Sequence, residues 1–303
     1  MDRTKLLIVL LVMLVITALL AGIPLLLQQP PASAPAAAQP ETPAAAAVSP
    51  VVEAGKTYLP FIFRNFSPGS VWQPAPGTTW QWQLSGEIDP SIDVHMYDID
   101  LFDAPQATID RLRADGRKVI CYFSAGTFEE GRPDSAKFPD ALKGNDVAGW
   151  PGEKWLDVRQ MEVLAPIMAA RLDLAVLKGC DGVEPDNVDG FSNPTGFPLT
   201  PQDQLNFNIW IADQAHTRGL SVGLKNNLGQ VNELLPYFDW ALNEQCFQFN
   251  ECDALLPFIQ AGKAVFGVEY ELEAEAFCPL ANAAGFQWLK KHRELDAWLL
   301  ACQ

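Results

Sequence analysis

The stretch VLAPIMAARLDLAVLKGCDGVEPDNVDG, residues 163–190, contains the repeating unit from which the fold can be predicted. Its first part, Val163 to Leu177, has helical character, and Gly179 follows where a left-handed cap would end a helix. A short apolar run, Gly182 to Pro185, comes next and leads directly into acidic residues. Short strands alternating with helices of this kind are typical of a parallel sheet whose connections are helical.

The same alternation recurs along the chain after Trp72. Two further helical patterns end before a glycine, one from Ala104 to Ala114 and one from Pro201 to Thr217. The candidate strands are the short apolar runs Trp80 to Leu84, Val94 to Ile99, Lys118 to Phe123, Gly182 to Pro185, Leu220 to Lys225, Trp240 to Asn243, Ala264 to Val268 and Gly285 to Leu289. Eight βα units predict an α/β fold that is a single TIM-type (β/α)8 barrel. An open doubly wound sheet is the less favoured alternative, because no glycine-rich dinucleotide-binding turn follows an early strand.

The N-terminal part of the chain has a different composition. Residues 6–27 carry no charge and are long enough to span a bilayer, and basic residues precede them. We expect a signal peptide or a membrane anchor here, with the rest of the chain outside the cytoplasm. Residues 28–70 are rich in proline and alanine and predict a linker and leader, and residues 71–303 are long enough for one barrel domain.

Charge and cysteine content restrict the partners and the compartment. The formal net charge is −16, which disfavours nucleic acid and anionic lipid headgroups and suits a cationic ligand. The alternative interpretation is that the negative charge only keeps the protein soluble outside the cell. Six cysteines in an exported chain predict disulfides of open connectivity, although Cys246 and Cys252 are close enough in sequence to close a small loop.

Acidic residues follow several of the candidate strands, where a barrel enzyme places its active site. These residues are Asp98, Asp100, Glu184, Asp186, Glu244 and Glu269. Glycosidic cleavage requires two carboxylates, one to protonate the departing oxygen and one to attack or stabilise the sugar carbon. The three histidines are scattered without a metal-binding spacing, so we expect no metal and no cofactor. A serine nucleophile is also disfavoured, because Tyr122 stands where a nucleophile elbow needs glycine.

Two of these acids are the stronger catalytic candidates. Asp186 lies in a segment that holds more acids than packing alone requires, and its structural alternative is a polar turn and helix cap. Glu244 ends an apolar run beside polar residues, and its alternative is a buried ion pair, for example with Lys225. Tryptophans near loops, among them Trp155, could stack on sugar rings or could simply pack in the core.

Ordered blocks of the sequence resemble glycoside hydrolase family 114, whose studied members act as endo-α-1,4-polygalactosaminidases. The resemblance runs from Trp80 to Cys302. Its blocks are WQWQLSG at 80–86, YDIDLFD at 97–103, ICYFSAG at 120–126, WPGEKWLDVR at 150–159, GCDGVEPDNVDG at 179–190, GLKNN at 223–227, NEQC at 243–246 and VEY at 268–270. The resemblance implies a TIM-type barrel. It also implies hydrolysis with retention of anomeric configuration, with Asp186 as nucleophile and Glu244 as acid/base.

The implied substrate is a cationic or partly acetylated galactosamine polysaccharide. We expect Asp98, Asp100, Glu184 or Glu269 to offer a carboxylate to a substrate ammonium. The candidate substrate-binding residues are Asp98, Asp100, Tyr122, Trp155, Glu184, Asn187, Lys225, Glu269 and Tyr270. We expect a monomer that binds no nucleic acid and is secreted or anchored through residues 6–27. A catalytically inactive polysaccharide-binding barrel and a glycosidase for another polymer are the alternatives.

Overall fold

The computed structural model describes residues 71–302. In this part of the chain, eight strands pair in parallel and follow one another in sequence order. They are β1 (Trp80–Gln83), β2 (Met96–Asp100), β3 (Lys118–Ser124), β7 (Gly182–Asp186), β8 (Ser221–Lys225), β9 (Trp240–Glu244), β10 (Val265–Glu269) and β11 (Gln287–Lys290). A short strand, β12 (Leu300–Ala301), adds to β11 in the antiparallel direction.

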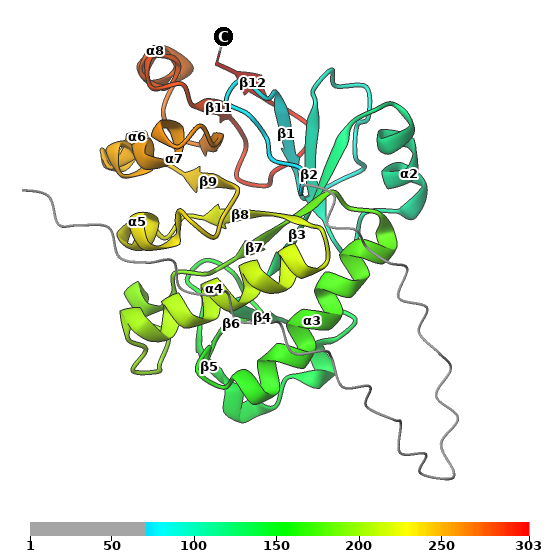
Figure 1. Cartoon of the computed structure of the whole chain (residues 1–303), viewed down its shortest axis with the longest axis vertical. Coiled ribbons are helices and arrows are strands. Elements are labelled where there is room, and N and C mark those ends of the chain that lie inside the picture. Colours follow the sequence, from blue (N-terminus) through cyan, green and yellow to red (C-terminus); the bar gives the residue numbers. More distant parts are fainter. Residues whose placement is uncertain (1–70, 303) are drawn as a thin grey trace, which may run out of the picture. The chain divides into compact units, whose positions relative to one another are not determined.

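Helices surround the strands in sequence order, as Figure 1 shows. They are α2 (Gln106–Ala114), α3 (Met161–Lys178), α4 (Pro201–Thr217), α5 (Val231–Leu234), α6 (Cys246–Phe249), α7 (Leu256–Gln260) and α8 (Ala274–Ala284). Local sequence fixes their ends. At α4, Thr200 and Asp203 form a capping box and Pro201 occupies the first turn. At the other end of α3, Gly179 adopts the left-handed conformation that stops the helix.

The first and last parallel strands, β1 and β11, are not paired with each other as neighbouring strands. Other hydrogen bonds connect them. The Trp80 indole Nε1 donates a hydrogen bond of 3.0 Å to the Gln287 carbonyl, which joins β1 to β11. The backbone N–H of Leu84 donates to the Leu295 carbonyl at 2.9 Å, so the segment after β11 returns to β1. The chain therefore curls into a (β/α)8 barrel.

Alternation along the strands divides the buried residues between two cores. Residues that point into the barrel include Trp80, Trp240 and Phe266, whose rings pack against one another with centroids 5.0 to 5.6 Å apart. The intervening residues pack under the helices in a second, larger core. Gly223 makes room for the inner core, because a Cβ there would lie 2.3 Å from the Trp240 ring.

The predicted barrel is confirmed, since each of the eight apolar runs overlaps one of the parallel strands. The three predicted helical patterns correspond to α2, α3 and α4. One boundary is corrected, because Gly285 is the left-handed cap of α8 and β11 begins at Gln287. The predicted hydrophobic segment, residues 6–27, and the linker, residues 28–70, lie outside the described residues.

None of the helices within residues 71–302 is long and apolar enough to cross a membrane.

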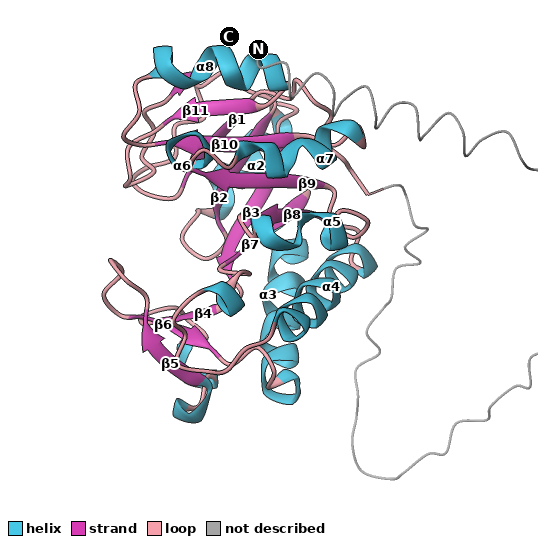
Figure 2. Cartoon of the chain, turned by 90° about the vertical axis from the view of Figure 1, so that its left-hand side faces the viewer, coloured by secondary structure: helices cyan, strands magenta, loops and turns pink. Residues whose placement is uncertain are grey.

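A small second sheet was not expected from the sequence. Its strands are β4 (Thr127–Glu129), β5 (Lys143–Asp146) and β6 (Glu153–Leu156), paired antiparallel in the order β4-β6-β5. They lie in the connection between β3 and α3, and Figure 2 shows them as a unit separate from the barrel sheet. The register shift between β5 and β6 interrupts the alternation that would have made these strands visible in the sequence.

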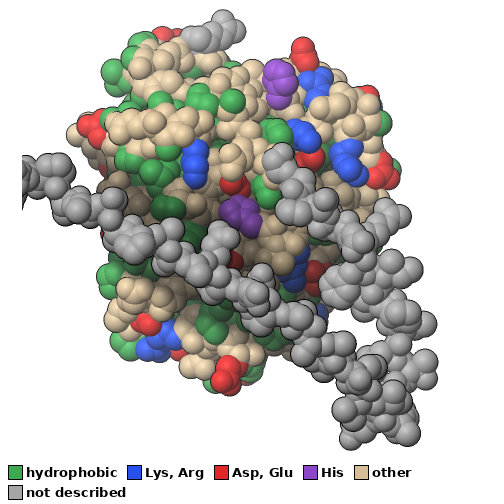
Figure 3. All heavy atoms as spheres, viewed as in Figure 1, with side chains coloured by type: hydrophobic (Ala, Val, Ile, Leu, Met, Phe, Trp, Pro, Cys, Tyr) green, Lys and Arg blue, Asp and Glu red, His purple; other side chains and the backbone are tan. Residues whose placement is uncertain are grey.

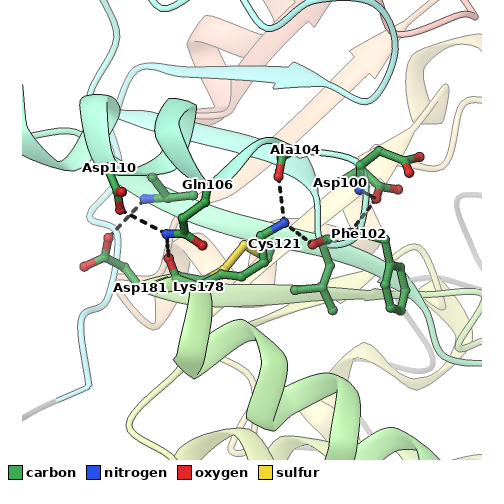
Figure 4. The surroundings of a disulfide bond; sticks show 12 residues. Asp100, Phe102, Ala104, Gln106, Asp110, Cys121, Lys178 and Asp181 are labelled. Atoms are coloured by element: carbon green, nitrogen blue, oxygen red, sulfur yellow. Dashed lines mark hydrogen bonds between the residues drawn. A yellow bond between two sulfur atoms is a disulfide. The ribbon is translucent and has the colours of Figure 1, made fainter. Parts of the chain in front are cut away.

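Three disulfides tie the barrel connections together. They join Cys121 to Cys180, Cys246 to Cys252 and Cys278 to Cys302, so the predicted pairing of Cys246 with Cys252 is confirmed. The first links β3 to the residue that follows the cap of α3 (Figure 4). Beside it, the Lys178 ammonium donates to the carbonyls of Leu101 and Ala104 at 2.7 and 2.6 Å.

Candidate active site

Two carboxylates and one ammonium meet at the ends of three adjacent strands. Asp186 ends β7, Lys225 ends β8 and Glu244 ends β9. The Lys225 Nζ lies 2.9 Å from Asp186 Oδ1 and 2.9 Å from Glu244 Oε2. These two carboxylate oxygens are therefore separated by no more than twice that distance.

The backbone holds Asp186 in place. Its carbonyl accepts hydrogen bonds from the N–H groups of Ala125 and Gly126, at 2.9 and 3.1 Å, and its Oδ1 accepts from the Asn187 N–H at 2.7 Å. A Cβ at Gly126 would lie 1.7 Å from the Asn187 carbonyl oxygen, so only glycine permits this approach. Asn187 itself adopts a left-handed conformation with φ of 59°, which turns the chain away from the strand.

Neighbouring polar groups keep Glu244 ionised. Its Oε1 accepts a hydrogen bond of 2.5 Å from the Tyr270 hydroxyl, and its Oε2 accepts one of 3.3 Å from the Asn226 amide. Burial by itself would raise the pKa of Glu244, but the Lys225 charge and these hydrogen bonds together hold that pKa below its ordinary value. Glu244 is thus a carboxylate in the unliganded protein at neutral pH.

Lys225 is almost completely buried, with 3 % of its side chain exposed. Burial alone would lower its pKa, but the negative charges of Asp186, Glu244 and Glu184 raise the pKa well above the ordinary lysine value. The ammonium also lies 5.0 Å from the centre of the Trp82 ring. Lys225 therefore stays charged and holds the two carboxylates together.

The two carboxylates open onto a pocket of about 410 Å³. Their side chains are 15 % and 27 % exposed for Asp186 and Glu244, so solvent and a ligand can reach both. Other predicted site residues that line the same pocket are Asp100, Tyr122, Trp155, Asn187 and Lys225. Tyr270 is placed behind Glu244 by its hydrogen bond and is not among the lining residues.

Three of the predicted substrate-binding residues do not line the pocket. Asp98 and Glu184 face into the barrel, one layer below the pocket, with no exposed surface. Burial raises the pKa of each well above its usual value, and for Glu184 the nearby Asp98 adds to the effect. Glu269 points the other way, toward the helices, where its Oε1 accepts from the Phe247 N–H at 2.9 Å. None of the three presents a carboxylate to the pocket.

Asp100 reaches the pocket but already has a strong partner. The Arg132 guanidinium binds both of its oxygens, at 2.7 and 3.0 Å. The same guanidinium donates to Glu129 at 2.7 Å. Asp100 therefore orients Arg132 on the pocket wall, and an incoming ammonium would have to compete with that ion pair.

Three further pocket residues are not among the predicted substrate-binding residues, and sequence reasoning missed one of them, Glu153, altogether. Glu153, on β6, lines the pocket, and its Oε1 accepts from the Asn187 amide at 3.1 Å. Burial raises the pKa of Glu153 to about 7, and burial raises that of Asp189 to about 6. Trp150 is 60 % exposed at the same pocket. All three lie inside sequence blocks that resemble the family, 150–159 and 179–190. Membership of these blocks is the sequence feature that could have identified them as site residues.

In the described residues, 71–302, no group of three or more His, Cys, Asp or Glu side chains is arranged to hold a metal ion. The pocket presents carboxylates, an ammonium and aromatic side chains to a ligand. Two carboxylates at one pocket are what glycosidic cleavage requires.

The comparisons with known proteins agree with this arrangement. The model of glycoside hydrolase family GH114 matches residues 64–303. The structure of Ega3 from Aspergillus fumigatus in complex with galactosamine is 44 % identical, with a TM-score of 0.73, covering 76 % of this chain and 97 % of that one. The glycoside hydrolase domain of PelA from Pseudomonas aeruginosa shares the fold at 14 % identity and a TM-score of 0.58, covering 74 % of this chain and 97 % of that one.

No curated protein matches the chain. The family match spans the whole barrel and the pocket described above. The chain belongs to glycoside hydrolase family GH114 and is a glycoside hydrolase.

Proposed function

We propose that this protein cleaves α-1,4-linked galactosamine polysaccharide internally, with retention of anomeric configuration. The observation that carries the proposal is the pairing of Asp186 and Glu244 about a single ammonium in an open pocket. Twice the 2.9 Å distance to Lys225 Nζ is below the ~6.5 Å at which inverting enzymes begin. The close approach of the nearest oxygens of the two carboxylates supports a double displacement.

In this mechanism Asp186 attacks the anomeric carbon while Glu244 gives a proton to the departing glycosidic oxygen. The covalent glycosyl-enzyme is then hydrolysed by a water that Glu244 deprotonates. Because Lys225 holds the pKa of Glu244 low in the free protein, Glu244 must take up a proton as substrate fills the pocket. Lys225 would then remain as the counter-ion of Asp186.

Charge around the pocket supports a cationic polymer as substrate. Eight carboxylates line it against three cationic side chains. The carboxylates are Asp100, Asp103, Glu129, Glu153, Asp186, Asp189, Glu244 and Glu294. The 44 % identical Ega3 was solved with galactosamine, the monomer of such a polymer. An ammonium on the 2-position of the sugar can form a charge-assisted hydrogen bond with such a carboxylate.

The test compares deacetylated and fully acetylated polygalactosamine as substrates for the purified protein. We expect reducing ends to appear from the deacetylated polymer much faster than from the acetylated one. Proton NMR of the first products should show the α-anomer before mutarotation. Equal rates on the two polymers would contradict the substrate assignment, and an initial β-anomer would contradict retention.

We further propose that the barrel works outside the cytoplasm and that residues 28–70 link it to the N-terminal segment. Three disulfides in the barrel support an oxidising compartment. The uncharged segment 6–27 would hold the protein at the membrane. Fractionation of cells that express the full chain, compared with a chain lacking residues 1–27, tests this: the full chain should sediment with membranes and the shortened chain should not.

A further inference from the structure

A second pocket, of about 470 Å³, adjoins the first on the side of Glu244. The two pockets share Asp189, Asn226 and Glu244 as lining residues. Asp186 lines the first pocket but not the second. Together they form one cleft in which Glu244 marks the boundary between two binding spaces.

The outer wall of the second pocket is a loop closed by a disulfide. The chain leaves β9 at Glu244, forms the single-turn helix α6 and returns at Cys252, which is bonded to Cys246. Inside this loop the Glu251 N–H donates to the Cys246 carbonyl at 2.9 Å. The ring of Phe249 is 60 % exposed, although it belongs to a short and covalently closed segment. The loop thus presents a fixed aromatic face at the edge of the pocket.

The lining of this pocket has the chemistry of an aminosugar site. Phe249 supplies an apolar face on which the C–H face of a sugar ring can stack. Asp189, Glu244 and Glu251 supply carboxylates, and no lysine or arginine is among the lining residues. A protonated amino group is therefore favoured here over a neutral acetamide or an anionic sugar.

The position of the two acids fixes which part of the polymer enters this pocket. Bond cleavage needs Asp186 below the anomeric carbon and Glu244 beside the glycosidic oxygen. Only the first pocket has both, so it receives the sugar that becomes attached to Asp186. The second pocket has only the proton donor, and it lies where the departing sugar begins.

We propose that the second pocket is a subsite for the leaving-group aminosugar, with Phe249 as its stacking platform and Glu251 as an acceptor for its ammonium. This inference rests on the proposed function, because it assumes that Glu244 protonates the departing oxygen. It gives the cleft binding sites on both sides of the scissile bond, which is the requirement for cleavage inside a polymer.

The experiment compares Phe249→Ala with the wild-type protein on two substrates. One is deacetylated polygalactosamine, and the other is a short galactosaminyl α-fluoride, whose leaving group is too small to fill the second pocket. We expect kcat/KM on the polymer to fall about 3- to 10-fold, the usual worth of one aromatic contact, with a much smaller change on the fluoride. Phe249→Trp, which keeps an aromatic ring at this position, should cleave the polymer at close to the wild-type rate. The matched control is Leu280→Ala, since Leu280 is 58 % exposed on α8, away from either pocket.

A second variant tests the ammonium acceptor. Glu251→Gln should lower kcat/KM on deacetylated polymer and leave the rate on partly acetylated polymer less affected. Equal losses of Phe249→Ala on polymer and fluoride, or no loss on either, would overturn the subsite while the hydrolase itself stood. A wild-type protein that cleaves neither substrate would instead overturn the proposed function.

Discussion

At the residue scale, the site is organised by one buried ammonium. Lys225 has 3 % of its side chain exposed and contacts both catalytic candidates at 2.9 Å. Removing one partner from a buried ion pair costs about 3–5 kcal/mol, so the three side chains are coupled in stability as well as in chemistry. Substitutions at the carboxylates must therefore keep shape and hydrogen bonding if activity is to be separated from folding.

The first prediction concerns the two carboxylates themselves. Asp186→Asn and Glu244→Gln keep the size of the side chain and remove its charge, so turnover on polymer should fall roughly a thousandfold or more while the fold is retained. Circular dichroism checks the fold, and reducing-end assays check the rate. The controls are Asp213→Asn and Glu233→Gln, which alter exposed acids on α4 and α5. A Glu244→Gln variant that still cleaves the polymer at wild-type rate would exclude Glu244 as proton donor.

The second prediction is the pH dependence of kcat/KM. The Lys225 charge and the hydrogen bonds from Tyr270 and Asn226 hold the pKa of Glu244 below its ordinary value, so the fraction of free protein with Glu244 protonated falls as pH rises. We expect kcat/KM to be higher near pH 5 than near pH 7.5. Initial rates at low substrate concentration measure it. A rise in kcat/KM toward pH 7.5 would argue that Glu244 does not enter the reaction as the acid.

The third prediction uses Glu153. Because burial raises its pKa to about 7 in the folded protein, its contribution to stability is full below pH 4.5 and is lost as pH rises through 7. Glu153→Gln removes the buried charge, so it should raise the free energy of unfolding at pH 8 by about 3 kcal/mol and change little at pH 4.5. Urea unfolding at both pH values measures this. The same effect at both pH values would mean that Glu153 does not titrate in this range.

At the element scale, the periodicity of the sequence predicted the parts of the barrel well. Apolar runs marked all eight parallel strands, since strands buried on both faces are nearly continuous in apolar residues. The glycine cap at Gly179 marked the end of α3. Gly285, which caps α8, had instead been assigned to a strand. The sequence did not predict the small sheet β4-β6-β5, because its strands are three or four residues long and β5 is largely polar and not buried.

The fourth prediction compares two of the disulfides. The bond between Cys121 and Cys180 spans 59 residues, and that between Cys246 and Cys252 spans six. The loop-entropy relation gives about 4 kcal/mol for the first and about 2 kcal/mol for the second. Replacing both cysteines of a pair by alanine should therefore lower the melting temperature more for the long loop. Calorimetry of the two double variants tests this ranking, and the reverse order would contradict it.

At the scale of the whole molecule, the formal net charge is −16. Its distribution differs between the surface and the pocket. On the face seen in Figure 3, acidic and basic side chains are interspersed. The catalytic pocket, in contrast, has eight carboxylates and three cations in its lining. Part of the surplus negative charge therefore lies at the pocket.

The fifth prediction follows from that field. Raising the salt concentration from about 0.05 M to about 0.5 M shortens the screening length severalfold, so KM for deacetylated polymer should increase several times. KM for a neutral, fully acetylated polymer, where cleavage is measurable, should change little. Michaelis–Menten analysis at several salt concentrations tests this. A salt-independent KM for the cationic polymer would mean that the acids contribute only short-range contacts.

The sequence by itself determined the order of the eight parallel strands, the positions of α2, α3 and α4, and the two strand ends that carry Asp186 and Glu244. It also allowed Cys246 to pair with Cys252 while leaving the other disulfides open. These features depend on local spacing, which the chain carries without reference to its other parts. Only the tertiary structure decided that Asp98 and Glu184 are sealed below the pocket, that Glu269 faces the helices, and that Glu153 joins the pocket from the small sheet. The stagger of neighbouring strands and the packing of distant segments set the depth and direction of each side chain, and both depend on contacts between residues far apart in the sequence.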